Sequence, residues 1–458
     1  MKKYVSQPLR ILLINAINPR VEVENRYPGL GLAYLVSSAR KALPEANIEF
    51  RISDRDIIKT INDYRPDLVG ITSVSQNFTI ARRYADFCAG LGIPVIMGGI
   101  HISSLPECLP ASATAGCRQE GERTFVELIK AFLDDKFNTG ALAHIPGISF
   151  WESGHLRHNE DRPAVDDLDQ LPMPARDLLN IRSHAYMFTS RGCPYRCTFC
   201  ASSRFWSKLR FFSAEYVVNE IESLIRDYRV SMISFFDDLF VADRPRLEEM
   251  IRILDRRKLL GKVRYTCSCR SNVVDDELAR LLAKMGVVSV GMGLESGDDE
   301  ILRFLKGKSA GVTENIRAIN ILKKAKIAVN GSFVIGSPYE TREQAMRTYD
   351  FIRQSRLDLF DIYLLTPYPG TPIWDYATDR NLVSDDMTDW SCLDVNIYRF
   401  PEKAIILSEV LERKEVIKLY KKFRRLRFRR NLRKIINHPM MRDVPRMGLN
   451  LLREAVSK

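Results

Sequence analysis

Two long blocks of the chain repeat one alternation, in which a short apolar run is followed by a segment with helical spacing. In the first block the predicted strands are 10–16, 47–52, 67–73 and 93–97, and the predicted helices are 29–43 and 79–91. Apolar runs that alternate with helices are typical of parallel strands that are buried on both faces. We therefore expect an α/β fold, with an N-terminal doubly wound parallel sheet of the Rossmann-like, flavodoxin-like kind.

The second block continues the alternation over about six strand–helix units. Its predicted strands are 187–190, 232–238, 263–270, 287–294, 327–335 and 360–366, and its predicted helices are 214–228, 245–260, 275–285, 313–325 and 341–356. Thr341 and Gln344 have the spacing of a capping box, which predicts where the last helix begins. Six units are two fewer than a closed (β/α)₈ barrel contains.

Prolines divide these blocks. The segment 162–176 has no periodicity and contains Pro163, Pro172 and Pro174, which is typical of a linker. The expected division is an N-terminal domain at 1–160, a linker at 161–186, a second domain at 187–385 and a C-terminal helical region at 386–458.

Three cysteines fall within one short stretch near the start of the second block. Cys193, Cys197 and Cys200 are separated by four and three positions, after Gly192. Three thiolates placed in this way can bind three corners of a [4Fe–4S] cluster and leave the fourth iron open to a substrate. A structural zinc site is the alternative, but it needs a fourth ligand, and no cysteine or histidine lies close by in the sequence.

This cysteine motif, with an aromatic residue before its last cysteine, resembles the signature of radical S-adenosylmethionine (SAM) enzymes. Pieces of the first block resemble the cobalamin-binding domain that precedes many radical SAM cores: 26–31, Gly98 to His101, Pro106-Glu107 and 120–122. The resemblance covers roughly residues 10–390 and implies an open six-unit partial barrel of the TIM type. One motif departs from other cobalamin proteins, because Asp54 to Ile58 contains no histidine that could bind cobalt from below.

The resemblance implies which residues hold each cofactor. The cluster ligands are Cys193, Cys197 and Cys200, and the SAM contacts are Phe199, Asp237, Asp238, Arg270, Ser271, Asn272, Glu295, Ser296 and Gly336. The implied cobalamin contacts are Ser73, Gln76, Asn77, Gly98, Gly99, His101 and Glu120. Polar residues at the carboxyl ends of parallel strands favour a site there. The alternative for each acid is a helix cap or a surface ion pair. His101 is either a cobalt ligand or, as we expect, a loop histidine bonded to the backbone or to a cofactor edge.

Five of the six other cysteines, considered for their spacing, suggest no second cluster. Cys88, Cys108 and Cys117 match no ligand spacing, and Cys267 and Cys269 lie two apart on one face of a predicted strand. We expect all five to be packed thiols. Nine cysteines, no signal-like N-terminus and no apolar run of about 20 residues predict a cytoplasmic protein that is soluble or peripheral.

The positive charge is concentrated near the C-terminus. The chain carries a net charge of +12, and residues 413–434 contain twelve lysines and arginines with one acid, Glu415. Apolar residues repeat at helical spacing between these cations, from Val416 to Leu426. The pattern leaves three interpretations open: a helix lying on an anionic membrane, a helix binding RNA, or a solvated helix packed on the core.

The expected reaction follows from the resemblance. One electron enters the cluster, SAM is cleaved, and the resulting 5′-deoxyadenosyl radical removes hydrogen from an unactivated carbon. A methyl group carried by cobalamin is then expected to be transferred to that carbon. Alternatives are an anaerobic oxidative cyclase on a porphyrin or lipid, an RNA-modifying methylthiotransferase and a non-catalytic cobalamin sensor. The expected partners are a small-molecule or lipid-like substrate, an electron donor such as flavodoxin or ferredoxin, and an anionic membrane surface; nucleic acid is not expected.

Overall fold

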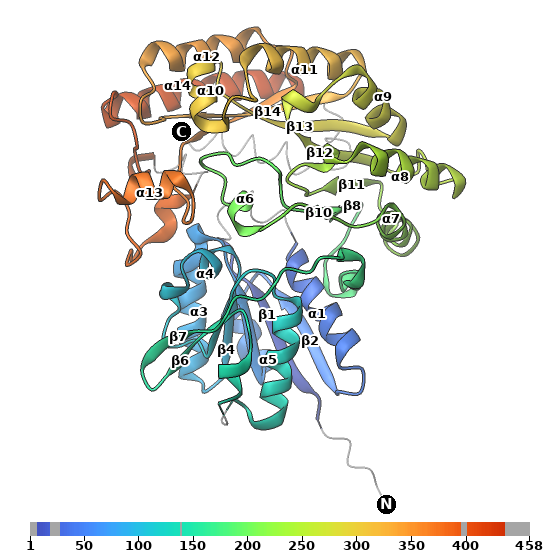
Figure 1. Ribbon diagram of the computed structural model, residues 1–458, viewed down its shortest axis with the longest axis vertical. Helices are drawn as coiled ribbons and strands as arrows, with labels where there is room; N and C mark the ends of the chain where they lie inside the picture. The colour runs from blue at the N-terminus through green and yellow to red at the C-terminus, as the bar shows by residue number, and fades with distance from the viewer. Residues whose placement is uncertain (1–6, 19–27, 138–139, 395–400, 436–458) are drawn as a thin grey trace, which may run out of the picture. The chain divides into compact units, whose positions relative to one another are not determined.

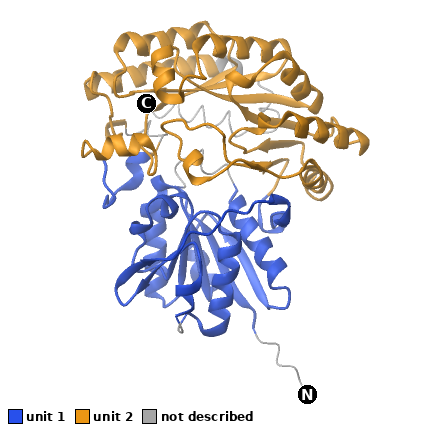
Figure 2. Ribbon diagram, viewed as in Figure 1, with its two compact units in different colours: residues 1–180, 383–393 blue, residues 181–382, 394–458 orange. Residues whose placement is uncertain are grey.

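The computed structural model describes residues 7–18, 28–137, 140–394 and 401–435, with the side chains of its last helix described up to Asn431. The chain forms two compact units (Figure 2). Unit 1 contains residues up to 180 together with 383–393, and unit 2 contains 181–382 and the residues from 394 onward. The chain therefore leaves unit 2 after Leu382, adds one short segment to unit 1 and returns. The resemblance at Arg26-Tyr27 lies outside the described residues.

Unit 1 is built on a seven-stranded sheet in the order β2-β1-β3-β4-β5-β6-β7. The strands are β1 (Leu9–Asn15), β2 (Ile48–Ser53), β3 (Leu68–Thr72), β4 (Val95–Gly98), β5 (Ala115–Cys117), β6 (Ile148–Glu152) and β7 (His155–His158). The first five pair in parallel, which confirms the predicted doubly wound sheet, and β6 and β7 add an antiparallel hairpin at one edge.

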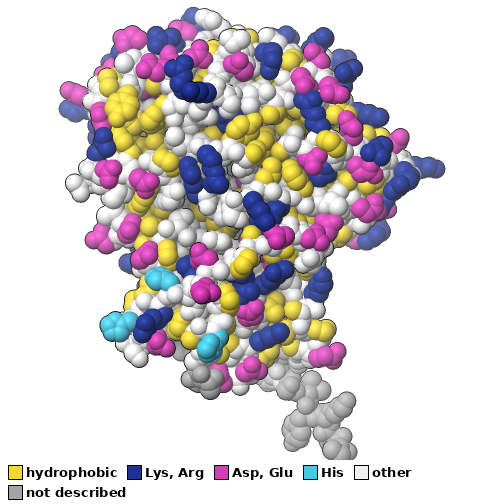
Figure 3. Space-filling model, in the orientation of Figure 1, with side chains coloured by type: hydrophobic (Ala, Val, Ile, Leu, Met, Phe, Trp, Pro, Cys, Tyr) yellow, Lys and Arg dark blue, Asp and Glu magenta, His cyan; other side chains and the backbone are white. Residues whose placement is uncertain are grey.

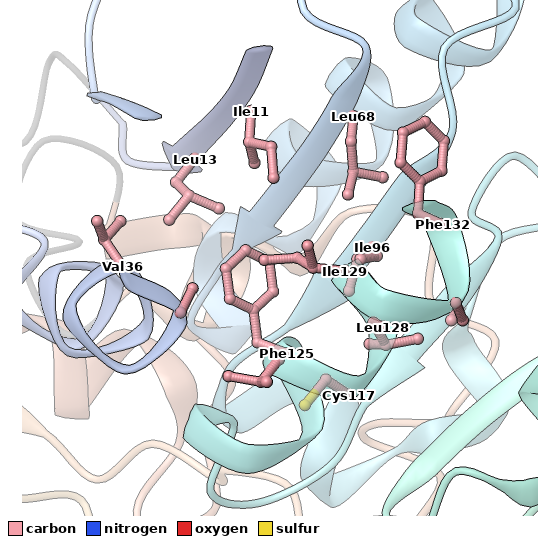
Figure 4. Close-up of a cluster of buried hydrophobic side chains, with 14 of the residues drawn as sticks. Ile11, Leu13, Val36, Leu68, Ile96, Cys117, Phe125, Leu128, Ile129 and Phe132 are labelled. Carbon is pink, nitrogen blue, oxygen red and sulfur yellow. The ribbon is translucent and has the colours of Figure 1, made fainter. Parts of the chain in front are cut away.

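Helices cover this sheet: α1 (Leu30–Ala42), α2 (Ile57–Tyr64), α3 (Phe78–Gly90), α4 (Ile100–Ser104) and α5 (Glu122–Asp135). On one face, Phe125 and Ile129 of α5 point toward Ile11, Leu13 and neighbouring strand residues (Figure 4). Phe125, Ile129 and Phe132 of α5 lie on one side of the helix, and together with Val36 of α1 they fill this core. This core contains side chains of β1, β3 and β4, so it packs these three strands against the same helix.

Unit 2 is built on a six-stranded parallel sheet in the order β15-β14-β13-β12-β11-β8 (Figure 1). The strands are β8 (His184–Met187), β11 (Met232–Phe235), β12 (Arg264–Cys269), β13 (Val287–Glu295), β14 (Ala328–Ile335) and β15 (Leu359–Leu364). Its helices are α6 (Ser202–Phe205), α7 (Ala214–Tyr228), α8 (Arg244–Arg256), α9 (Asp276–Met285), α10 (Asp299–Lys306), α11 (Val312–Lys324), α12 (Arg342–Gln354), α13 (Pro372–Thr378) and α14 (Arg413–Ile435). The arrangement confirms the expected six-unit partial barrel, and the capping box at Thr341 and Gln344 is present.

Local details differ from the expectation at the start of this sheet. The first strand is His184–Met187, not 187–190, and Ser190–Arg191 instead forms β9, which pairs antiparallel with β10 (Arg210–Phe211). Helix α10 was not predicted, because its eight residues follow β13 after a very short loop. Both differences concern the segments that surround the cysteine loop.

Helix α14 packs its apolar side on the protein. Val416, Leu419, Tyr420 and Phe423 are all buried, and the helix contacts β15 and α12. The interpretation in which this helix packs on the core therefore describes the structure, and its apolar stripe is not available to enter a bilayer. None of the described helices combines the length and apolarity needed to cross a membrane. On the face shown in Figure 3, cationic and anionic side chains are interspersed.

Candidate active site

The cysteine loop begins directly after the short strand β9. Gly192 has a φ of +94°, and a Cβ at this position would lie 2.6 Å from the carbonyl oxygen of Lys208. A side chain there would meet both a strained backbone conformation and a clash, so glycine is needed for the chain to turn into the loop. Cys193, Cys197 and Cys200 follow, each partly exposed.

Hydrogen bonds anchor this loop to two helices of unit 2. The backbone N–H of Thr198 donates to the carbonyl of Leu305 at the end of α10 (3.0 Å), and the N–H of Ile373 in α13 donates to the carbonyl of Thr198 (3.3 Å). The N–H of Cys200 donates to the carbonyl of Cys197 (3.3 Å). The three thiols are thus carried on one tight, pinned segment beyond the carboxyl end of β8.

The surroundings of the loop raise the pKa of two of its thiols, those of Cys193 and Cys200. Burial raises the pKa of Cys193 and of Cys200, and the nearby Asp238 carboxylate raises both further, while backbone N–H groups lower them in part. Iron ligation would remove the thiol protons, because the thiolate is the metal-binding form. No three His, Cys, Asp or Glu side chains among the described residues are arranged around a single ion. Ligands of a single ion such as Zn²⁺ must surround one point. The ligands of a four-iron cluster need not, because each thiolate binds a different corner of the cluster.

Asp237 and Asp238 have different surroundings although they are adjacent. Asp237 is buried, and its Oδ1 accepts hydrogen bonds from the N–H (3.0 Å) and the hydroxyl (3.0 Å) of Thr189 and from Ser190 Oγ. It therefore fixes the junction between β8 and the cysteine loop. Asp238 accepts hydrogen bonds from Ser202 Oγ at 2.8 and 2.7 Å. Burial raises the pKa of both carboxyls.

Residues at the end of β12 reach the cysteine loop directly. Nη1 of Arg270 donates to Sγ of Cys197 at 3.2 Å, and Nδ2 of Asn272 donates to Oη of Tyr195 at 2.9 Å. Ser271, between them, is buried, and its Oγ has no hydrogen-bond partner in the described chain. The structure thus brings Arg270 and Asn272 together with the cluster motif, which lies more than 70 positions away in the sequence.

Glu295, at the end of β13, forms a buried ion pair with Lys306 of α10. The carboxylate oxygen lies 3.6 Å from Nζ, and both side chains are almost fully buried. Burial raises the pKa of Glu295, and the charges of Lys306 and Arg270 oppose that shift. Ser296, next in sequence, is instead engaged beside α12, where its Oγ contacts Thr348 Oγ1 at 3.0 Å.

Gly336 marks the end of β14 and leads to a residue that sequence reasoning missed. The N–H groups of Gly336 and Ser337 donate to Oε2 of Glu340 at 2.6 and 3.3 Å. Burial raises the pKa of Glu340 to about 7 despite these two donors. In the sequence, an acid four positions after a glycine that ends a strand could have indicated that the carboxylate binds the backbone N–H groups at the strand end. Phe199, also predicted at this site, lies half-buried in the cysteine loop.

In unit 1, the loops after β3 and β4 pack tightly against each other. A Cβ on Gly99, whose φ is +96°, would lie 2.6 Å from both the Ser73 carbonyl oxygen and Thr72 Oγ1. Ser73 itself is buried, and its Oγ has no partner among the described residues. Gly98 and Ser73 are joined by a backbone hydrogen bond of 3.4 Å. The predicted residues of these two loops therefore form one cradle of backbone and small side chains.

His101 lies beside this cradle in an aromatic enclosure. Its ring centroid is 3.9 Å from that of Phe78 and 4.4 Å from that of Trp390, and its Nδ1 is 3.1 Å from Ser75 Oγ. Trp390 belongs to the segment 383–393 that returns to unit 1. Burial lowers the pKa of His101 to about 3, so the imidazole is neutral. The ring supports the loop from inside the unit.

The remaining predicted cobalamin contacts lie at the same end of the sheet of unit 1. Gln76 and Asn77 form a turn of 3-10 helix with Ser75, directly after β3. Glu120 precedes α5, and its Oε2 accepts a hydrogen bond of 2.7 Å from the N–H of Val165. Cys88 and Cys117 are buried, and Cys108 donates to the Asp385 carbonyl at 3.2 Å, so these thiols are packed as expected.

Each of the two units contains a region that matches a known protein family. The profile of the B12 binding domain matches residues 19–129, and that of the radical SAM superfamily matches residues 187–352. An uncharacterized methyltransferase of Pyrococcus horikoshii is 33% identical over 372 residues, covering 78% of this chain and 80% of that protein. The anaerobic magnesium-protoporphyrin IX monomethyl ester cyclase of Cereibacter sphaeroides is 26% identical over 387 residues, covering 80% of this chain and 62% of the cyclase.

A solved structure shares the fold. The radical SAM methyltransferase TsrM from Kitasatospora setae, solved with cobalamin and a [4Fe–4S] cluster, superposes with a TM-score of 0.65 at 21% identity, covering 81% of this chain and 76% of TsrM. The doubly wound unit and the partial barrel agree with this architecture. The chain belongs to the cobalamin-binding family of radical SAM enzymes, whose cofactors are a [4Fe–4S] cluster, SAM and cobalamin.

Proposed function

We propose that this protein is a cobalamin-dependent radical SAM methyltransferase that acts on an unactivated carbon of a small molecule. The observation that carries the proposal is the anchored loop of three partly exposed thiols, in a chain that also contains a cobalamin-binding domain. Cys193, Cys197 and Cys200 would each bind one iron. The methyltransferase named among its relatives supports the choice of methyl transfer.

When bound, the cluster supplies the electron that cleaves SAM, and cobalamin supplies the route for the methyl group. The chain's own residues position the substrates and keep water away. Asp238 is suited to the amino group of SAM, because its carboxylate lies at the cysteine loop and is held by one hydroxyl, that of Ser202.

Unsatisfied polar atoms support a SAM-binding role for the ends of β12 and β14. Ser271 Oγ, Asn272 Oδ1, Ser337 Oγ and Glu340 Oε1 are buried without hydrogen-bond partners among the described residues. Buried polar groups usually have partners, so such a set favours a polar ligand that supplies them. A ribose and an amino acid carboxylate carry suitable donors and acceptors. Glu340 would hold the backbone of Gly336 through Oε2 and offer Oε1 to the ligand.

The cradle of unit 1 supports cobalamin binding in the same way. Ser73 Oγ is a buried hydroxyl without a described partner, and Gly98 and Gly99 allow the backbone to approach a bulky ligand. Gln76, Asn77 and Glu120 would contribute polar contacts at the rim. His101 would act by supporting the loop, because its ring is enclosed by Phe78 and Trp390.

An oxidative cyclase is the second candidate, since a magnesium-protoporphyrin ester cyclase is among the relatives. The two reactions differ in the fate of the methyl group of SAM. A methyltransferase consumes one SAM as methyl donor besides the SAM that it cleaves, whereas the cyclase would transfer no methyl group.

The partners of this reaction belong to the same proposal. A low-potential one-electron donor such as flavodoxin or ferredoxin would reduce the cluster. A lipid-like substrate would bring the enzyme to an anionic membrane, where exposed cations of α14 such as Lys414, Lys418 and Lys421 would supply attraction that weakens with salt. With the apolar side of α14 buried, that attraction would be electrostatic alone.

The test uses anaerobically reconstituted full-length protein, SAM with an isotopically labelled methyl group, a strong reductant and a small-molecule extract. We expect 5′-deoxyadenosine together with a labelled product, and neither from Cys197→Ala. Cys392→Ala is the matched control, because this thiol lies outside the loop. 5′-Deoxyadenosine without any labelled product would favour the cyclase, and no 5′-deoxyadenosine from cluster-loaded protein would contradict both functions.

A further inference from the structure

A buried arginine touches one of the three cysteine sulfurs. Arg270 follows β12, is 6% exposed, and places Nη1 3.2 Å from Sγ of Cys197. This distance is within hydrogen-bonding range for sulfur. Of the three thiols in the loop, Cys197 therefore has a cationic donor directed at its sulfur.

The guanidinium is held in this position by contacts on several sides. Its Nη2 donates to the carbonyl of Lys306 (3.0 Å) and to Ser309 Oγ (3.1 Å), so the fork cannot rotate freely. Its carbon atom lies 4.0 Å from the centre of the Tyr195 ring, in the geometry of a cation–π contact. Asn272 in turn donates to the hydroxyl of Tyr195 and fixes the ring. The direction of Nη1 is thus determined by four residues.

The charge of Arg270 needs an anionic partner. Its two other hydrogen bonds go to a carbonyl and a hydroxyl, both neutral. The nearby Glu295 carboxylate interacts with the charge of Arg270 but forms its ion pair with Lys306. A buried cation that donates only to neutral acceptors, and shares its nearby carboxylate with a lysine, is costly. The thiolates and the iron–sulfur cluster that they would bind place negative charge opposite Nη1 of Arg270.

We propose that Arg270 is a positioning residue that raises the reduction potential of the [4Fe–4S] cluster through its hydrogen bond to Cys197. The inference rests on the proposed function, in which Cys197 is a cluster ligand. An external donor would reduce the bound cluster by one electron, from the 2+ to the 1+ state, and Arg270 would make and break no bond. The reduced cluster carries one more negative charge and would be attracted more strongly by the guanidinium. Arg270 would therefore stabilise the reduced state more than the oxidised state, which raises the reduction potential.

The test is a redox titration of the cluster in the reconstituted full chain, followed by the EPR signal of its reduced state. We expect Arg270→Gln to lower the midpoint potential by about 59 mV or more, which is a tenfold change in the one-electron equilibrium constant. Arg270→Lys keeps the charge and should lose less. Arg280→Gln removes an exposed cation from the same unit and should leave the potential unchanged.

A second measurement separates the contact from a general effect on the fold. Pulsed EPR of the reduced cluster in protein labelled with [¹⁵N]arginine should show a nitrogen coupling that Arg270→Lys abolishes. Where Arg270→Gln does not retain its cluster, Arg270→Lys and Tyr195→Leu carry the test, and both should lower the potential. An unchanged potential in these variants, with normal iron content, would overturn the role of Arg270. Wild-type protein that forms no cluster would instead contradict the proposed function.

Discussion

Asn431 pairs with both backbone groups of Phe360. Its Nδ2 donates to the Phe360 carbonyl at 3.0 Å, and the Phe360 N–H donates to its Oδ1 at 3.3 Å. Phe360 lies in β15, the last strand of the open barrel, whose outer edge would otherwise present unpaired groups. One side-chain amide on α14 thus takes the place that a further strand would occupy.

Asn431→Ala should therefore destabilise unit 2. The substitution leaves a buried N–H and a buried carbonyl without partners, and we expect a loss of about 1–3 kcal/mol in the free energy of unfolding. Denaturant unfolding measures it, with Lys421→Ala as the control on the exposed side of the same helix. Equal stability of Asn431→Ala and the control would show that the amide is not needed at this edge.

Glu340 should make the stability of the protein depend on pH. Burial raises its pKa to about 7 in the folded state, so folding favours the protonated carboxyl. Its stabilising contribution is complete below the unfolded pKa near 4.5 and is lost as the pH rises through about 7, a change on the order of 3 kcal/mol. Glu340→Gln keeps the acceptor oxygen but removes the titration.

Thermal unfolding from pH 5 to pH 8 tests this expectation. The wild type should lose stability relative to Glu340→Gln as the pH rises, whereas Glu343→Gln, an exposed position on the same helix, should follow the wild type. Parallel curves for the wild type and Glu340→Gln would show that the carboxyl does not titrate in this range.

His101 should remain neutral well below neutral pH. Its pKa is lowered to about 3 by burial, because Phe78 and Trp390 exclude water from the ring. A depressed pKa means that its contribution to stability is complete above the unfolded pKa of about 6.5 and falls as the pH decreases toward 3. NMR titration of the His101 ring should show no change from pH 8 to pH 5. Trp390→Ala should move the transition upward, and a wild-type transition near pH 6.5 would contradict the enclosure.

Sequence reasoning was most accurate where local signals are strong. Helix α7 begins and ends at the predicted residues, because Ser213 caps it and its apolar residues keep one face. Strand β5 was missed, since three residues, Ala115–Cys117, carry no period. The contact of Arg270 with Cys197 and that of Trp390 with His101 join residues far apart in the chain, so no local pattern announces them.

The apolar residues of α14 should matter for folding. Phe423 is fully buried, so Phe423→Ala should cost about 3–5 kcal/mol of unfolding free energy. It should not change sedimentation with anionic vesicles, which the exposed cations alone would drive and which should weaken with salt. Lys418→Glu is the matched variant for charge, and it should reduce vesicle binding without a large loss of stability. Vesicle binding that depends on Phe423 in a stably folded variant would contradict the packing of α14.

The cysteine loop carries the central claim, and anaerobic reconstitution of the triple variant Cys193→Ala, Cys197→Ala, Cys200→Ala tests it most directly. Each thiolate is expected to bind one iron of the cluster, so the variant should lose the four-iron EPR signal and form no 5′-deoxyadenosine from SAM. The wild type and Cys392→Ala should show both. A triple variant that keeps its iron content and still produces 5′-deoxyadenosine would contradict the assignment of this loop.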